Sequence, residues 1–82
     1  MFLFVVEQVF PTSLGVVLVP GHRTNRARAG TSIRLVRPDR STIDTKIKGI
    51  EFESGDILLG PDVRNEEVLV GTEVWLIEAP LS

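Results

Sequence analysis

The chain has 82 residues, of which 43% are hydrophobic and 24% charged, with a net charge of only −2. This is the composition of one small globular domain spanning residues 1–82, not that of a disordered chain. Cysteine is absent and histidine occurs once, which excludes disulfides, thiolate metal sites, a cysteine nucleophile and any site that needs two histidines of one chain.

Short apolar runs separated by turn-forming residues predict an all-β fold, and no stretch has the periodicity of a helix. Six strands are expected, at Phe2–Phe10, Gly15–Val19, Ser32–Val36, Ile43–Phe52, Asp56–Leu59 and Glu73–Glu78. Proline, glycine, serine and aspartate predict turns at 11–13, 20–21, 37–41, 54–56 and 60–62. The apolar N-terminus is too short to span a bilayer and lacks the features of a secretory signal, so we expect no membrane contact and a cytoplasmic protein.

Apolar and charged residues alternate clearly in Ile33–Arg37 and Ile43–Lys48, which predicts one face on a core and one in water. The expected core residues are Phe4, Val6, Val9, Val17, Val19, Ile33, Leu35, Ile43, Ile47, Ile50, Ile57, Leu59, Val68 and Val74. Val5, Val16 and Val36 then face outward. Such a surplus of outward apolar residues predicts an exposed apolar patch.

Three segments carry a family resemblance: GVVLVPGHRTNRARAGTSIRLV at Gly15–Val36, KGIEF at Lys48–Phe52, and VRNEEVLVG at Val63–Gly71. In order and spacing they resemble the second domain of translational GTPases such as elongation factor Tu. The resemblance extends from about Val6 to Ile77 and implies a small, closed, six-stranded antiparallel β-barrel. It transfers no ligand-contacting residue, because the loop that the family carries after Phe52 is nearly absent here. The phosphate-binding loop of a GTPase is also absent, so no GTP hydrolysis is expected.

The charges are divided between the two halves of the chain. Eight of the nine Lys and Arg residues lie in residues 23–48, and eight of the 11 Asp and Glu residues lie in 51–78. The basic half predicts an anionic partner and the acidic half a cationic one, unless the two halves neutralise each other in the fold.

A basic segment over residues 22–37 is the candidate for contact with an anion or RNA. Arginine can bind phosphate through two parallel hydrogen bonds, and the residues proposed for this contact are Arg23, Arg26, Arg28, Arg34 and Arg37. The loop 22–28 has no aromatic residue on which a base could stack. A solvated hairpin loop or a protein contact are the alternatives. His22 has no evident catalytic partner, so we do not expect an enzyme.

Trp75 is the only tryptophan and lies in an uninterrupted apolar run. It either covers one end of the barrel or anchors a protein partner or a second subunit. Together with Glu66 and Glu67 it forms the predicted protein interface. The spacing of the carboxylates in 51–67 does not match a calcium loop, and no metal or other cofactor is expected.

These observations predict a small, non-enzymatic binding module that acts through surface recognition. The expected partner is a protein, which would make the chain a mimic, an inhibitor or an immunity-type protein. The alternative is an RNA-binding module that contacts transfer RNA or the ribosome through residues 22–37. An apolar strand surface would also allow the chain to form a homo-oligomer.

Overall fold

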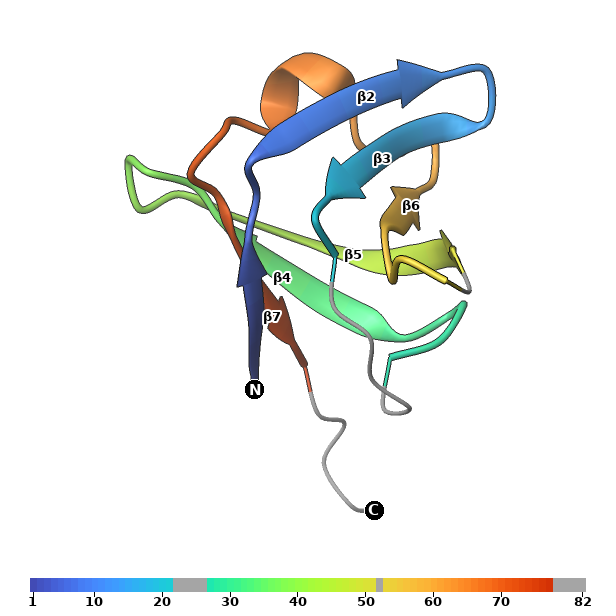
Figure 1. The fold of residues 1–82 in the computed structure, drawn as a ribbon. Coiled ribbons are helices and arrows are strands. Elements are labelled where there is room, and N and C mark those ends of the chain that lie inside the picture. The colour runs from blue at the N-terminus through green and yellow to red at the C-terminus, as the bar shows by residue number, and fades with distance from the viewer. Residues whose placement is uncertain (22–26, 52, 78–82) are drawn as a thin grey trace.

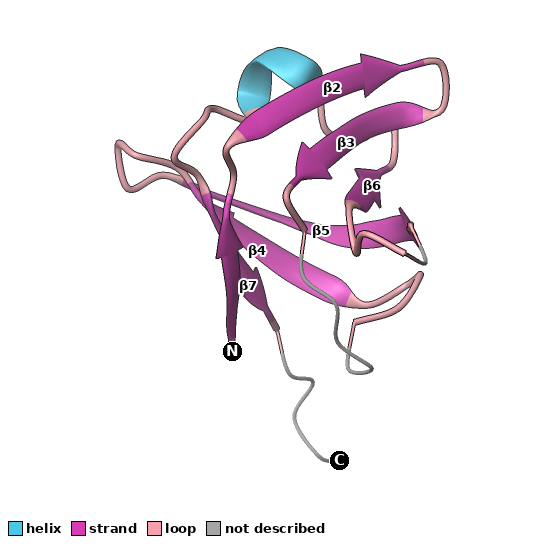
Figure 2. Cartoon of the chain, viewed as in Figure 1, coloured by secondary structure: helices cyan, strands magenta, loops and turns pink. Residues whose placement is uncertain are grey.

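The computed structural model describes residues 1–21, 27–51 and 53–77. Its elements, in chain order, are β1 (Phe2–Val5), β2 (Gln8–Thr12), β3 (Gly15–Val19), β4 (Ser32–Val36), β5 (Thr42–Ile50), β6 (Ile57–Leu59), the 3₁₀-helix η1 (Asn65–Glu67) and β7 (Glu73–Leu76). The strands form one sheet in the order β1-β7-β4-β5-β6-β3-β2, with every neighbouring pair antiparallel. The sheet curls into a half-barrel, so that β2 and β3 lie across from β4 and β7 (Figures 1 and 2). The predicted all-β fold is confirmed.

The prediction of a closed six-stranded barrel is wrong, because the sheet has seven strands and is open. The extra strand arises where the expected strand Phe2–Phe10 divides into β1 and β2. The backbone of Val6 bonds to Thr72 and Gly71, and the amide of Glu7 bonds to Val19. β1 therefore pairs with β7 and β2 with β3, which places the two halves of one extended segment at opposite edges of the sheet.

The predicted strand ends differ in several places. β2 continues through Pro11 and Thr12, where a turn was expected. Proline has no backbone N–H to donate, but β2 is an edge strand and has a hydrogen-bonded neighbour on one side only, so the proline is tolerated. The chain instead turns at residues 13–14. The turn at 37–41 is confirmed by hydrogen bonds between Arg37 and Ser41 and between Arg40 and Arg37. The helix η1 was not predicted.

The later strands are shorter than expected. β5 ends at Ile50, β6 begins at Ile57 and β7 ends at Leu76. The expected ends of two of these strands, Phe52 and Glu78, lie outside the described residues. Within the described ranges the only helix is the single turn η1, far too short and polar to cross a bilayer.

The core lies inside the curl of the sheet and contains most of the residues expected there. Nine of the 14 are buried and the others, Val9, Val17, Val19, Ile43 and Ile50, are half-buried. The predicted face of β3 is wrong, since Val16 and Leu18 point into the core and Val17 and Val19 point outward. Every residue of this strand after Gly15 is apolar, so alternation could not choose the face. The core also includes six residues that were not expected there: Leu3, Val16, Leu18, Ala27, Val63 and Leu76.

Two buried threonines give a matched test of polar burial. The Thr72 side chain is fully buried and its hydroxyl has no hydrogen-bond partner, whereas Thr45 donates to a carboxylate oxygen of Asp62. We expect Thr72→Val to raise the free energy of unfolding by about 1 kcal/mol, because an unsatisfied buried hydroxyl is costly. Thr45→Val should lower it by about 1 kcal/mol, because it leaves Asp62 without its donor. Urea denaturation of both variants measures the difference, and a loss of stability in both would contradict the prediction.

Candidate interaction surfaces

The outer face of β1, β7 and β4 carries an exposed aromatic pair. The ladder places Phe2 of β1 opposite Trp75 of β7, and their side chains are 44% and 37% exposed. The rings meet edge to face, with centroids 5.2 Å apart and planes inclined by 69°. This is a favourable geometry for two aromatic rings and leaves much of both in solvent. Val5 of β1 is also exposed and lies opposite Glu73 of β7. Phe2, Val5 and Trp75 together form what we call the Trp75 surface.

Polar groups around the Trp75 surface are satisfied within the protein. The indole Nε1 of Trp75 donates to Oε1 of Glu73 at 2.8 Å. On the other side of Trp75, the ladder places Arg34 of β4, which pairs in turn with Asp44 of β5. The two rings are therefore bordered by polar groups that already have partners in the protein, while the rings themselves stay partly exposed.

Arg34 and Asp44 form a two-point ion pair. Nε of Arg34 donates to Oδ1 of Asp44 at 2.8 Å and a terminal nitrogen donates to Oδ2 at 2.9 Å. These hydrogen bonds lower the pKa of the Asp44 carboxyl below its ordinary value and raise the pKa of Arg34. Both side chains are half exposed, so solvent screens the pair and its contribution to stability is small. Its consequence for recognition is larger, because a phosphate would have to compete with Asp44 for Arg34.

The basic segment is only partly available for an anion. Arg23, Arg26 and His22 lie outside the described residues. Arg37 is half-buried and donates from Nε to the Ser41 hydroxyl at 2.7 Å and from a terminal nitrogen to the Glu67 carbonyl oxygen at 3.4 Å. Arg28 is exposed just before β4.

The acidic members of the predicted protein interface do not join Trp75. Glu66 and Glu67 are on η1, where a carboxylate oxygen of Glu67 accepts the backbone N–H of Arg64 at 3.0 Å. This hydrogen bond satisfies a backbone N–H at the start of the 3₁₀-helix. Glu67 lies near Arg37, whereas Trp75 lies opposite Arg34, three positions back along the same chain segment. Three residues of extended chain span about 10 Å, so Glu67 belongs to a separate part of the surface.

The pairing of Trp75 with Phe2 was not predicted, because the two residues are far apart in the sequence and only the ladder brings them together. The pairing of Arg34 with Asp44, in contrast, could be predicted from the sequence. A turn at 37–41 places Val36 opposite Thr42. Counting two residues along each strand away from the turn brings Arg34 opposite Asp44. The alternative that the basic and acidic halves neutralise each other finds no support from this pair, since both of its members lie in the basic half.

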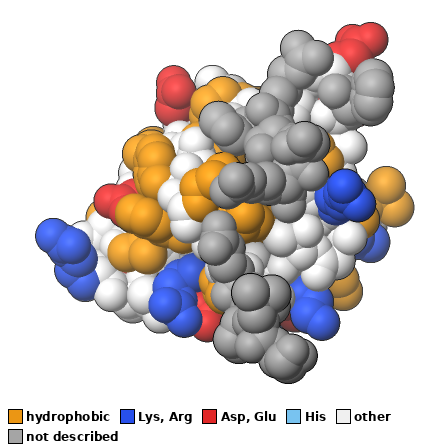
Figure 3. Space-filling model, turned by 90° about the horizontal axis from the view of Figure 1, so that it is seen from below, with side chains coloured by type: hydrophobic (Ala, Val, Ile, Leu, Met, Phe, Trp, Pro, Cys, Tyr) orange, Lys and Arg blue, Asp and Glu red, His pale blue; other side chains and the backbone are white. Residues whose placement is uncertain are grey.

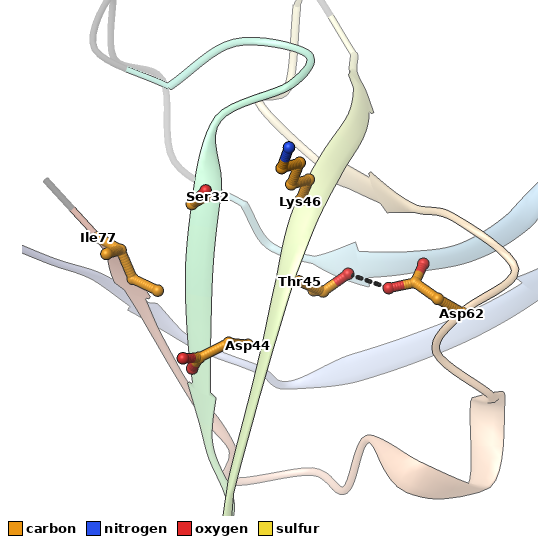
Figure 4. Close-up of a pocket in the computed structure, with 6 residues that line it drawn as sticks. All are labelled: Ser32, Asp44, Thr45, Lys46, Asp62 and Ile77. Carbon is orange, nitrogen blue, oxygen red and sulfur yellow. Dashed lines mark hydrogen bonds between the residues drawn. The ribbon is translucent and has the colours of Figure 1, made fainter. Parts of the chain in front are cut away.

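An open depression of about 590 Å³ includes Asp44, the acidic member of the ion pair, in its lining (Figure 4). Its lining residues are Ser32, Asp44, Thr45, Lys46, Asp62 and Ile77. Asp44 is engaged by Arg34, and Asp62 by Thr45. Both carboxylates of the depression therefore have hydrogen-bond partners within the protein.

Hydrophobic side chains also gather on the face seen from the end of the molecule where β1 begins, with Lys and Arg side chains at its margin (Figure 3). Across residues 1–21, 27–51 and 53–77, no group of three His, Asp or Glu side chains is close enough to hold a metal ion. Comparison of the chain with protein-family models, curated proteins and solved structures gives no match.

Proposed function

We propose that the protein is a non-enzymatic binding module that recognises a protein partner through the Trp75 surface. The observation that carries the proposal is the exposed edge-to-face pair of Phe2 and Trp75. Tryptophan and other large aromatic side chains provide most of the binding free energy in many protein interfaces. In this pair the rings hold each other in place, so little conformational freedom would be lost when a partner covers them.

The charges favour a protein over RNA at this surface. A phosphate-binding site needs arginines that are free to donate, but Arg34 is occupied by Asp44 and Arg37 by Ser41. Glu73 adds a further carboxylate beside Trp75. RNA contact through residues 22–37 stays the alternative, supported by the exposure of Arg28 and by the arginine content of the segment.

The resemblance to the second domain of elongation factor Tu enters this proposal as a hypothesis of origin. A barrel-like module of that type in the cytoplasm would serve as a mimic, an inhibitor or an immunity-type protein. Each of these roles requires only a stable surface that binds one macromolecule tightly. A second copy of the chain is a further partner that the Trp75 surface could accept.

The test is affinity purification with matched surface variants, carried out at low and high salt. Trp75→Glu and Phe2→Glu each place a charge in the Trp75 surface. Val70→Glu is the control, because Val70 is also exposed, at 64%, but lies in the turn before β7. Circular dichroism melting of each variant shows whether it is folded. The partner is identified by mass spectrometry and bound RNA is measured in the same eluates.

We expect one protein to be retained by the wild type and by Val70→Glu at both salt concentrations. Both Trp75 surface variants should bind it at least roughly 30-fold more weakly, as for the loss of a central aromatic contact. Recovery of RNA that falls steeply with salt and is unchanged in these variants would instead support the RNA alternative. A protein that binds all four forms equally would contradict the proposed surface.

A further inference from the structure

A second concave surface lies on the outer face of β3, β5 and β6, away from Trp75. It is a groove of about 450 Å³, within the range of sites that bind small ligands or single side chains. The residues that line it come from the β2–β3 turn, β3, β5 and β6: Thr12, Ser13, Leu14, Val17, Gly49, Ile50, Glu51, Asp56 and Leu58. None of these belongs to the Trp75 surface.

The floor of the groove, formed by Val17, Leu58 and Gly49, belongs to an apolar row that crosses four strands and continues to Phe10, which does not line the groove. The ladder places Phe10 of β2 opposite Val17 of β3, Val17 opposite Leu58 of β6, and Leu58 opposite Gly49 of β5. These side chains point away from the core, since the residues that alternate with them, such as Leu18 and Leu59, are fully buried. The row therefore offers apolar surface to a partner along its whole length.

Gly49 deepens this floor without being required by the backbone. It lies in β5 beside a β-bulge, where its φ is not left-handed, and an added Cβ would meet only a methyl of Leu58 at 3.8 Å, an ordinary contact. Glycine within a strand lowers stability, and such a glycine often marks a place where a ligand approaches the backbone closely. At Gly49 the fold has room for a side chain. The absence of a side chain here therefore leaves the floor of the groove open without being needed for the fold.

One end of the groove carries two carboxylates. Glu51 follows the floor along β5, and its backbone N–H bonds to the Asp56 carbonyl oxygen at 2.9 Å, which holds the two acidic residues together. Among the described residues no ion pair engages either carboxylate. On the other side of Gly49, Lys48 is occupied by the carbonyl oxygen of Leu14, to which its Nζ donates at 2.9 Å.

We propose that this groove binds a segment of a partner protein that presents an apolar side chain next to a lysine or arginine. The apolar side chain would lie over Gly49, between Val17 and Leu58. The cationic group would lie between Glu51 and Asp56, whose negative charge is complementary to it. The site is independent of the Trp75 surface, so it stands whether or not that surface binds a partner.

The probe is a display library of random seven-residue peptides, selected on the immobilised wild-type protein. Enriched sequences are then synthesised with a fluorescent label and measured by anisotropy. Gly49→Val fills the floor, and the pair Glu51→Gln and Asp56→Asn removes the charge without changing shape. Trp75→Glu is the matched control, because it alters the other surface. Thermal melting of each variant reports whether the fold is intact.

We expect enriched peptides to combine an apolar residue with an adjacent Lys or Arg. Their affinity should fall at least tenfold in Gly49→Val and in the double variant, and should be unchanged in Trp75→Glu. Failure to enrich any peptide over the Gly49→Val protein would overturn the proposal, as would enriched peptides without a basic residue. A self-associating wild type that Gly49→Val converts to a monomer would also overturn it, because the occupant would then be a second copy of this chain.

Discussion

Replacing Gly15 with alanine is expected to lower the free energy of unfolding by about 3 kcal/mol or more, enough to leave a small domain largely unfolded. Gly15 opens β3 directly after the β2–β3 turn with a φ of +143°, a conformation that residues with a side chain rarely adopt. An added Cβ would lie 2.0 Å from the carbonyl oxygen of Leu59. That oxygen belongs to the neighbouring strand, so relief would require β3 and β6 to separate.

Gly30→Ala is the matched control for this substitution. Gly30 also has a positive φ, +91°, but no atom lies within 4 Å of an added Cβ. Its replacement should therefore cost only the left-handed backbone penalty, about 1 kcal/mol. Urea denaturation of the two variants separates conformational strain from steric conflict. Equal losses of stability would show that the close approach of β3 to β6 is not what requires glycine at position 15.

The sequence identifies strands well where turn residues bound them and poorly where pairing alone decides. β3 and β4 occupy the expected Gly15–Val19 and Ser32–Val36, because glycine and proline or a clear alternation mark their ends. The break after Val5 has no such signal. It exists because Val6 and Glu7 bond to residues 71–72 and to Val19, which are distant in the sequence. Barrel closure and strand number depend on that break, so both were predicted wrongly.

The same distinction applies to the surfaces. Trp75 stands out in the sequence because it is the only tryptophan, and the structure places it partly exposed on the outer face of β7. Phe2 and the groove around Gly49 could not be found, since each depends on the register between strands far apart in the chain. Arg34 and Arg37 were predicted as phosphate contacts because the sequence shows that they are charged but does not show which residues they bind. Their hydrogen bonds to Asp44 and Ser41 are visible only in the fold.

Truncation of Leu35 to alanine is expected to lower the free energy of unfolding by about 2–5 kcal/mol. Leu35 is fully buried in β4, which pairs with both β5 and β7, so neighbouring backbone cannot easily move to fill the cavity. Arg34→Ala, the adjacent residue on the outer face, is the control and should change stability little, because its ion pair is solvent-exposed. Chemical denaturation measures both variants. A small effect of Leu35→Ala, similar to that of Arg34→Ala, would mean that β4 does not lie at the centre of a closely packed core. The curled sheet that supports both proposed surfaces would then be in doubt.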